Sequence, residues 1–264
     1  MASIRIRAVL QLARLRTLYA YRHGDWRKLP IAENHEPMVQ VPLEQCYPYY
    51  ARQMKLVADE RIFLRAEVLR RFQVARAFLK DRGFDLIVYD GWRSLKLQES
   101  LFWFYMREFT AAKFNLKEQF APLEVDAVRE YFAALSKTMQ SNLKEANRSY
   151  VSWPSKDPSA PSPHATGVAI DVWLYQNGQP VNLGVPFDWM EVDAGAFYHF
   201  RRNRKPFLGN DRIICARREI MLYAMIQAGF TCYGPEIWHF NYGNQMDALV
   251  RGGHAVYSYI EPSP

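Results

Sequence analysis

The sequence predicts an α+β fold in which helices pack on a small antiparallel sheet. Stretches with helical spacing of apolar residues alternate along the chain with short apolar stretches of strand length. The pair Asn177-Gly178, a hairpin turn signal, directly follows one of these short stretches. No helix is opened by the glycine-rich loop that cradles phosphate in many parallel α/β folds, so the alternation favours α+β.

The first half of the chain contains a clear helix and strand. Apolar residues recur at helical spacing over residues 64–79, and Gly83 follows where a C-terminal cap is expected. Residues 84–90 then predict a mostly buried strand. After a short turn, Ser94 is placed to cap a helix that continues to about residue 109.

The second half begins with a polar segment rich in Lys, Glu, Ala and Gln at residues 110–150, which predicts an inserted helical pair or lid. Closely spaced prolines then predict a loop that leads into His164. The remaining predicted elements are a strand at residues 168–175, a helix at residues 211–228 that Gly229 ends, and strands at residues 230–233 and 237–242.

Charge separates the N-terminal part from the rest. The net charge is +7, but residues 1–28 hold seven Lys or Arg against one acid, Asp25, which leaves 27 basic and 26 acidic residues elsewhere. A nearly neutral body removes the main support for nucleic-acid binding. We therefore expect a basic arm and extended loop at residues 1–50, and a single domain with its helical insertion at residues 51–264.

Arginines interrupt the apolar residues of the arm, which argues against a secretory signal, and they do not share one helical face. We expect an extension that is solvated or docked on the core. No apolar run approaches the ~20 residues of a membrane span. The three cysteines are widely spaced, which argues against a disulfide framework. The sequence thus favours the cytoplasm over the periplasm and leaves the oligomeric state open.

Two short motifs carry the chemistry. His164 and Asp171 lie seven residues apart across Gly167, and His239 arrives from the C-terminal strand. Two imidazoles and one carboxylate form a ligand set suited to one catalytic zinc ion with a coordination site left for water. Asp171 stands in an apolar strand, where a carboxylate needs a partner or a metal. Glu236, three residues before His239, can then act as a base beside the metal.

The pattern S-x-H-x-x-G-x-A-x-D, followed by E-x-W-H, resembles the zinc D-alanyl-D-alanine dipeptidases, whose fold is shared with zinc D,D-carboxypeptidases and the hedgehog signalling domain. The resemblance extends from about Tyr50 to about Tyr242, with the helical insertion unmatched. It implies zinc on the three ligands above and Glu236 as general base and acid.

The resemblance also implies roles for three other residues. Arg93, in the turn Asp90-Gly91-Trp92-Arg93, would stabilise the oxyanion of the tetrahedral intermediate. Asp188 would hold the substrate's free ammonium, and Ser162 would hydrogen-bond the substrate at its carboxylate end. Tyr50 is a weaker candidate contact for the N-terminus.

The predicted function is hydrolysis of D-Ala-D-Ala or a related D-amino dipeptide by metal-activated water. One alternative is a D,D-carboxypeptidase that trims longer peptidoglycan stems, and Asp188 argues against it because a long stem brings no free ammonium. Another is a non-catalytic zinc module, which would have no need of Glu236 and Arg93. The helical insertion bears on substrate identity and leaves the zinc chemistry unchanged.

Overall fold

The computed structural model describes residues 2–148, 150–155 and 157–262. At the centre of this described part is a five-stranded antiparallel sheet with the strand order β3-β4-β7-β6, in which β5 pairs with the end of β4. The strands are β3 (Asp85–Asp90), β4 (Ala169–Gln176), β5 (Gln179–Pro180), β6 (Thr231–Cys232) and β7 (His239–Asn241). A separate antiparallel pair joins β1 (Met38–Gln40) to β2 (Phe63–Arg65). The predicted α+β class is confirmed.

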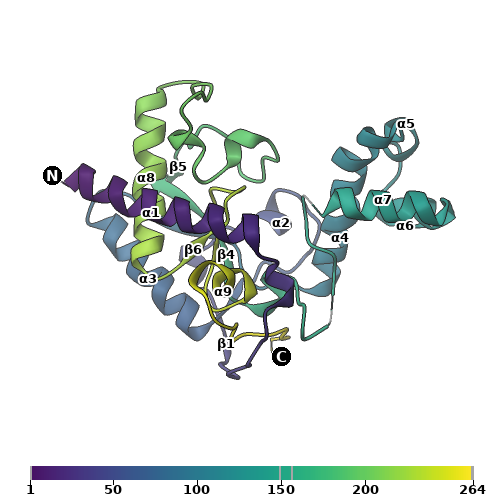
Figure 1. Cartoon of the computed structure of the whole chain (residues 1–264), viewed down its shortest axis with the longest axis horizontal. Coiled ribbons are helices and arrows are strands. Elements are labelled where there is room, and N and C mark those ends of the chain that lie inside the picture. Colours follow the sequence, from purple (N-terminus) through teal and green to yellow (C-terminus); the bar gives the residue numbers. More distant parts are fainter. Residues whose placement is uncertain (1, 149, 156, 263–264) are drawn as a thin grey trace.

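Helices surround this sheet. The long helices α1 (Ala2–His23) and α3 (Ala66–Lys80) both pack on α8 (Asp211–Gln227), and α3 also contacts β3. The helical segment predicted at residues 110–150 consists mainly of α5 (Lys117–Phe120), α6 (Val125–Ala134) and α7 (Lys137–Asn147). Figure 1 shows this segment projecting from the body at the end opposite α8. It is joined to the body through α4 (Leu95–Tyr105).

Local sequence signals explain the element boundaries. The Ser94 hydroxyl accepts a hydrogen bond from Leu97 N at 3.1 Å, as the predicted cap requires. Asn177 and Gly178 have φ angles of 52° and 74°, which close the predicted hairpin between β4 and β5. One boundary was wrong: Leu64 belongs to β2, and the helix begins at Ala66.

The N-terminal arm is helical and docked. Leu10 is fully buried, Thr17 is nearly so, and α1 packs against both α8 and α9 (Gln245–Arg251). An ion pair of 3.1 Å between Arg7 and Glu219 adds a contact to α8. Of the two expected arrangements, solvated or docked, the structure has the second.

The helix α9 was not predicted, although Asn244 offers a cap signal, since its side chain accepts from Asp247 N at 3.0 Å. None of the helices in the described residues is long and apolar enough to cross a membrane.

Candidate metal and catalytic site

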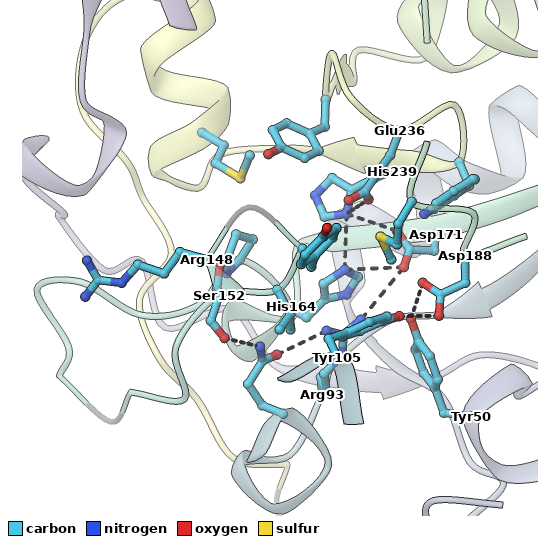
Figure 2. Close-up of a pocket in the computed structure, with 18 of the residues that line it drawn as sticks. Tyr50, Arg93, Tyr105, Arg148, Ser152, His164, Asp171, Asp188, Glu236 and His239 are labelled. Atoms are coloured by element: carbon cyan, nitrogen blue, oxygen red, sulfur yellow. Dashed lines mark hydrogen bonds and ion pairs between the residues drawn. The ribbon is translucent and has the colours of Figure 1, made fainter. Parts of the chain in front are cut away.

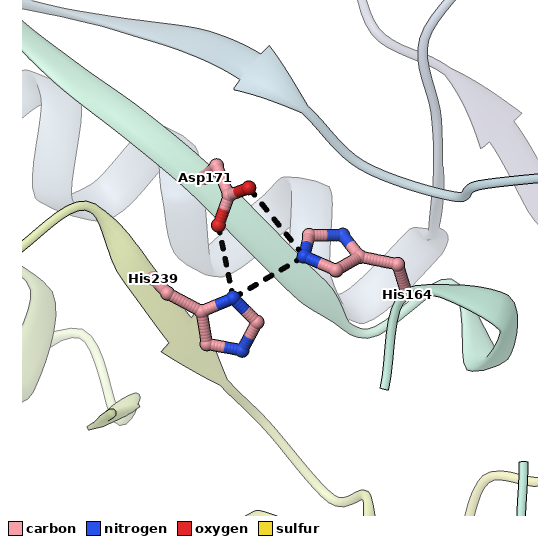
Figure 3. A group of neighbouring side chains, drawn as sticks. All are labelled: His164, Asp171 and His239. Atoms are coloured by element: carbon pink, nitrogen blue, oxygen red, sulfur yellow. Dashed lines mark hydrogen bonds and ion pairs between the residues drawn. The ribbon is translucent and has the colours of Figure 1, made fainter. Parts of the chain in front are cut away.

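The central sheet brings the predicted metal ligands together. Asp171 on β4 lies directly opposite His239 on β7 in the strand register. His164 lies in the single 3₁₀ turn that leads into β4. Gly167 ends this turn with φ +72°, and a Cβ there would come within 2.5 Å of Met38 Sδ, so the turn requires glycine. The three ligands therefore come from a turn and two neighbouring strands (Figure 3).

The ligand atoms of these three side chains converge. His239 Nδ1 lies 3.0 Å from Asp171 Oδ1, and His164 Nε2 lies 3.4 Å from Asp171 Oδ2. The two imidazole nitrogens are 3.2 Å apart, and all three residues are buried. Among the described residues, this is a group of side chains whose ligand atoms all lie within 4.8 Å of one another.

Outer contacts fix the direction of both imidazoles. His164 Nδ1 lies 2.8 Å from the carbonyl oxygen of Gly91, and His239 Nε2 lies 3.2 Å from Asn241 Oδ1. Because an oxygen accepts at each outer nitrogen, a hydrogen belongs there, and the inner nitrogen of each ring is directed toward Asp171 and the other imidazole. Such second contacts are typical of metal-binding histidines.

The charge state of the site also fits a divalent cation. Burial, with Arg93 nearby, lowers the pKa of His164 to about 3, so this imidazole is neutral, as a ligand must be. Burial raises the pKa of Asp171, but the two imidazoles and Arg93 more than offset this and leave it below its usual value. Its Oδ1 is buried and has no hydrogen-bond partner among the described residues. Burial lowers the pKa of His239, but Asp171 above all more than offsets this and raises it, so a metal would have to displace a proton there. Two imidazole nitrogens and a carboxylate oxygen are a donor set that suits zinc.

Glu236 lies at the edge of this ligand set, in the loop between β6 and β7. Its Oε2 is 3.9 Å from His239 Nδ1, and its side chain is 19% exposed. Burial raises the pKa of Glu236 to about 7. A carboxyl group with that pKa can accept a proton and return it at neutral pH.

Arg93 is held rigidly beside the ligands. Its Nε and Nη2 donate to Asp90 Oδ2 at 3.0 and 2.6 Å, and its Nη1 donates to Gln98 Oε1 at 3.1 Å. The Nη2 atom is 3.9 Å from Asp171 Oδ2, and the guanidinium carbon lies 5.1 Å from the centre of the Tyr50 ring. The cation is thus oriented before any substrate arrives.

Asp188 faces the same cavity from the segment after β5. Tyr50 donates to its Oδ1 at 3.4 Å, and the Tyr105 hydroxyl donates to its Oδ2 (Figure 2). Burial raises the pKa of Asp188 to about 6. The sequence offered only a weak signal for Tyr50 and none for Tyr105, which reaches Asp188 because α4 turns that face toward the cavity.

A single cavity joins most of these groups. Arg93, the three metal ligands, Asp188 and Glu236 all line it, together with Tyr50, Tyr105 and Arg148 of the helical segment. Ser162 is buried and is not among the described residues that line this cavity. Its backbone carbonyl accepts from Ala165 N at 3.0 Å within the turn before β4.

Comparison with known proteins now gives the family. Residues 105–257 match the model of peptidase family M15, described as D-ala-D-ala dipeptidase, and this range is more than half of the chain. The chain belongs to this peptidase family. The resemblance inferred from the motifs is thereby confirmed. The range includes the three predicted metal ligands, Asp188 and Glu236, runs through the helical segment at residues 110–150, and begins after Arg93.

A curated member of the dipeptidases supports the same assignment. The D-alanyl-D-alanine dipeptidase of Synechocystis sp. (strain ATCC 27184 / PCC 6803 / Kazusa) is 27% identical over 234 residues. The alignment covers 83% of this chain and 86% of the relative.

One buried arginine on α8 fixes the loop that carries Asp188. Arg218 is fully buried, and its Nε and Nη1 donate to the carbonyl oxygens of Leu183 and Gly195 at 2.6 and 3.2 Å. The preceding residue, Ala194, accepts at its carbonyl oxygen from Ile237 N at 2.9 Å, which ties the loop to the segment that carries Glu236.

Replacement of Arg218 by methionine is expected to lower the free energy of unfolding by about 2 kcal/mol, because the buried carbonyl oxygen of Leu183 loses its donor. The carbonyl oxygen of Gly195 loses one of two donors and keeps the bond from Tyr198 N. Urea unfolding would measure this change. The matched control is Arg217→Met, since Arg217 is a neighbouring, partly exposed side chain whose contact to Asn182 O is 3.4 Å long. Equal stability of the two variants would contradict the prediction.

Proposed function

We propose that the protein is a zinc-dependent dipeptidase that hydrolyses D-Ala-D-Ala or a related D-amino dipeptide. The observation that carries this proposal is the convergence of two imidazole nitrogens and an unsatisfied carboxylate oxygen beside Glu236. Membership of the peptidase family and the name of the Synechocystis relative support it.

The residues of the site divide the chemistry among them. A zinc ion held by His164, Asp171 and His239 would act as a Lewis acid and lower the pKa of a water toward ~7. A carboxylate oxygen of Glu236 takes the proton of the attacking water and returns it to the leaving amine. Arg93 presents fixed N–H groups to the carbonyl oxygen that becomes negative, which costs little reorganisation.

Asp188 sets the length of the substrate. The two tyrosines orient its carboxylate. A free ammonium group would give this half-buried acid an ion-pair partner, which none of the described residues supplies. An acylated amine, as in a peptidoglycan stem, would leave Asp188 unpaired, which disfavours the carboxypeptidase alternative. The role of Ser162 stays a prediction from the resemblance, and its position outside the cavity lining gives that role no support.

The test is release of free D-alanine from D-Ala-D-Ala by zinc-loaded protein, with a chelator-treated sample as control. Release that the chelator stops, and that zinc restores, is the expected result. A rate for an N-acetylated tripeptide equal to that for the free dipeptide would favour the carboxypeptidase. No release from either peptide by protein that retains one zinc would favour the binding module.

Replacement of Asp188 by asparagine is expected to raise KM for D-Ala-D-Ala about 10- to 100-fold, because a hydrogen bond to a charged group contributes about 1.5–3 kcal/mol. The ratio of kcat/KM for the free dipeptide to kcat/KM for the N-acetylated dipeptide should fall at the same time. Steady-state kinetics on both substrates measures this ratio. Asp193→Asn is the matched control in the same loop, and an unchanged ratio in the Asp188 variant would refute the ammonium assignment.

A further inference from the structure

A second hollow adjoins the catalytic cavity on the side of Glu236. Tyr150, Met190, Tyr233 and Glu236 line both spaces. A group bound at the catalytic residues can therefore extend into the second hollow past the Glu236 side chain.

The walls of this hollow are mainly apolar. Leu18 of α1 forms one side, and Trp189 and Val192 of the loop after Asp188 form another. These side chains remain 48%, 42% and 58% exposed, respectively. Single exposed apolar residues are ordinary, but a group of them around one hollow that opens beside a catalytic residue indicates a binding surface.

A polar group in the same wall also lacks a partner. Tyr21 lines the hollow, and its hydroxyl is buried with no hydrogen-bond partner among the described residues. Its ring packs edge-on against Tyr233, with ring centres 5.6 Å apart. A buried hydroxyl without a partner is destabilising, and a bound ligand with an acceptor group would satisfy it.

The proposed chemistry determines which part of a dipeptide reaches this hollow. Asp188 holds the ammonium of the first residue, whereas Glu236 delivers its proton to the amine of the second. The second residue therefore lies beside Glu236, where the hollow begins. The Tyr21 hydroxyl can then donate to the carboxylate of that residue.

We propose that the hollow formed by α1 and residues 189–192 is a subsite for a large apolar side chain on the second residue of the dipeptide. The inference rests on the proposed dipeptidase function and names its substrate class: D-amino dipeptides that end in a residue of leucine or phenylalanine size. The wall from α1 precedes residues 105–257, so it lies outside the part of the chain that matches the family model.

The test compares kcat/KM for D-Ala-D-Ala, D-Ala-D-Phe and D-Phe-D-Ala. D-Ala-D-Phe is expected to be favoured over D-Ala-D-Ala by at least about 10-fold, the lower end of what added apolar contact in a pocket gives. A higher kcat/KM for D-Ala-D-Ala than for D-Ala-D-Phe would overturn the subsite while leaving the dipeptidase function standing. Preference for D-Phe-D-Ala would overturn the assignment to the second residue. Failure to hydrolyse any of the three would overturn both proposals.

Two substitutions on α1 locate the effect. Leu18→Trp places a larger ring in the hollow and narrows it, and is expected to reduce the D-Ala-D-Phe preference at least about 10-fold. Leu15→Trp is the matched control, because Leu15 is 61% exposed on the same helix and is not among the residues that line the hollow. Its substrate ratio should equal that of the unmodified protein. The same D-Ala-D-Phe to D-Ala-D-Ala ratio in both variants would show that the hollow does not bind substrate.

Tyr21→Phe keeps the ring and removes the hydroxyl. It should raise KM for D-Ala-D-Ala and for D-Ala-D-Phe, and unchanged KM values would show that the hydroxyl does not contact the substrate.

Discussion

Replacement of Glu236 by glutamine is expected to lower kcat by about 10²- to 10⁴-fold while one zinc ion stays bound per chain. Glutamine keeps the size of the side chain but cannot take a proton from water. Burial raises the pKa of Glu236 to about 7, so the native carboxyl exchanges its proton readily at neutral pH. The loss should appear in kcat more than in KM, because the substituted group acts on the reacting atoms and not on the ends of the substrate.

Steady-state kinetics together with elemental analysis for zinc would test this expectation. Glu130→Gln is a suitable control, because Glu130 is an exposed acid on α6. Turnover retained at the native rate would refute the role of base. Loss of zinc along with activity would instead make Glu236 a metal ligand.

The three candidate metal ligands stand out in the sequence because a local physical rule applies to them. Asp171 stands in a strand whose first six residues are all buried, and a carboxylate in such surroundings needs compensation. The glycine that the turn requires and the histidine before it mark the second ligand. These features depend on neighbouring residues in the chain, so the sequence contains them directly.

The supporting residues depend on tertiary structure. The pairing of β3 with β4 shifts register between Val88 and Asp90, and this irregularity places Asp90 opposite Asp171. A shift of one residue moves a side chain to the other face of a sheet, so sequence alone does not place Asp90 opposite Asp171. Tyr105 likewise reaches Asp188 only through the rotation of α4 in the folded chain.

The N-terminal helix shows a different limit. Its docked face consists of Leu10 and of small residues such as Thr17 and Ala20. The hydrophobicity of this face therefore differs little from that of the other faces of the helix. The arginines are spread over the remaining faces, and the pattern in sequence therefore indicated only an extension. Its contacts with α8 and α9, and its wall of the apolar hollow, are tertiary features.

Replacement of Asp171 by asparagine is expected to weaken zinc binding by at least about 100-fold, since loss of a ligand charge should exceed the 10- to 100-fold effects of residues that only orient ligands. Asparagine has nearly the same shape, and Arg93 keeps its hydrogen bonds to Asp90, so the sheet should still form. Competition with a chromogenic chelator measures the affinity. Asp193→Asn provides the control, and an unchanged zinc affinity in the Asp171 variant would remove this carboxylate from the metal site.

Thermal unfolding with and without zinc gives an independent measure of the same ligand set. A ligand that binds only the folded state stabilises it by about 4 kcal/mol at a thousand times its Kd, so zinc should raise the Tm of the native protein. At the same zinc concentration, zinc should stabilise the folded Asp171→Asn protein by about 2.7 kcal/mol less, or still less if affinity falls more than 100-fold. Its Tm should therefore rise less than the Tm of the native protein. The two measurements must agree if zinc binds through the converging atoms of His164, Asp171 and His239. A zinc-dependent Tm shift of native size in the variant would mean that the metal stabilises the fold from another site.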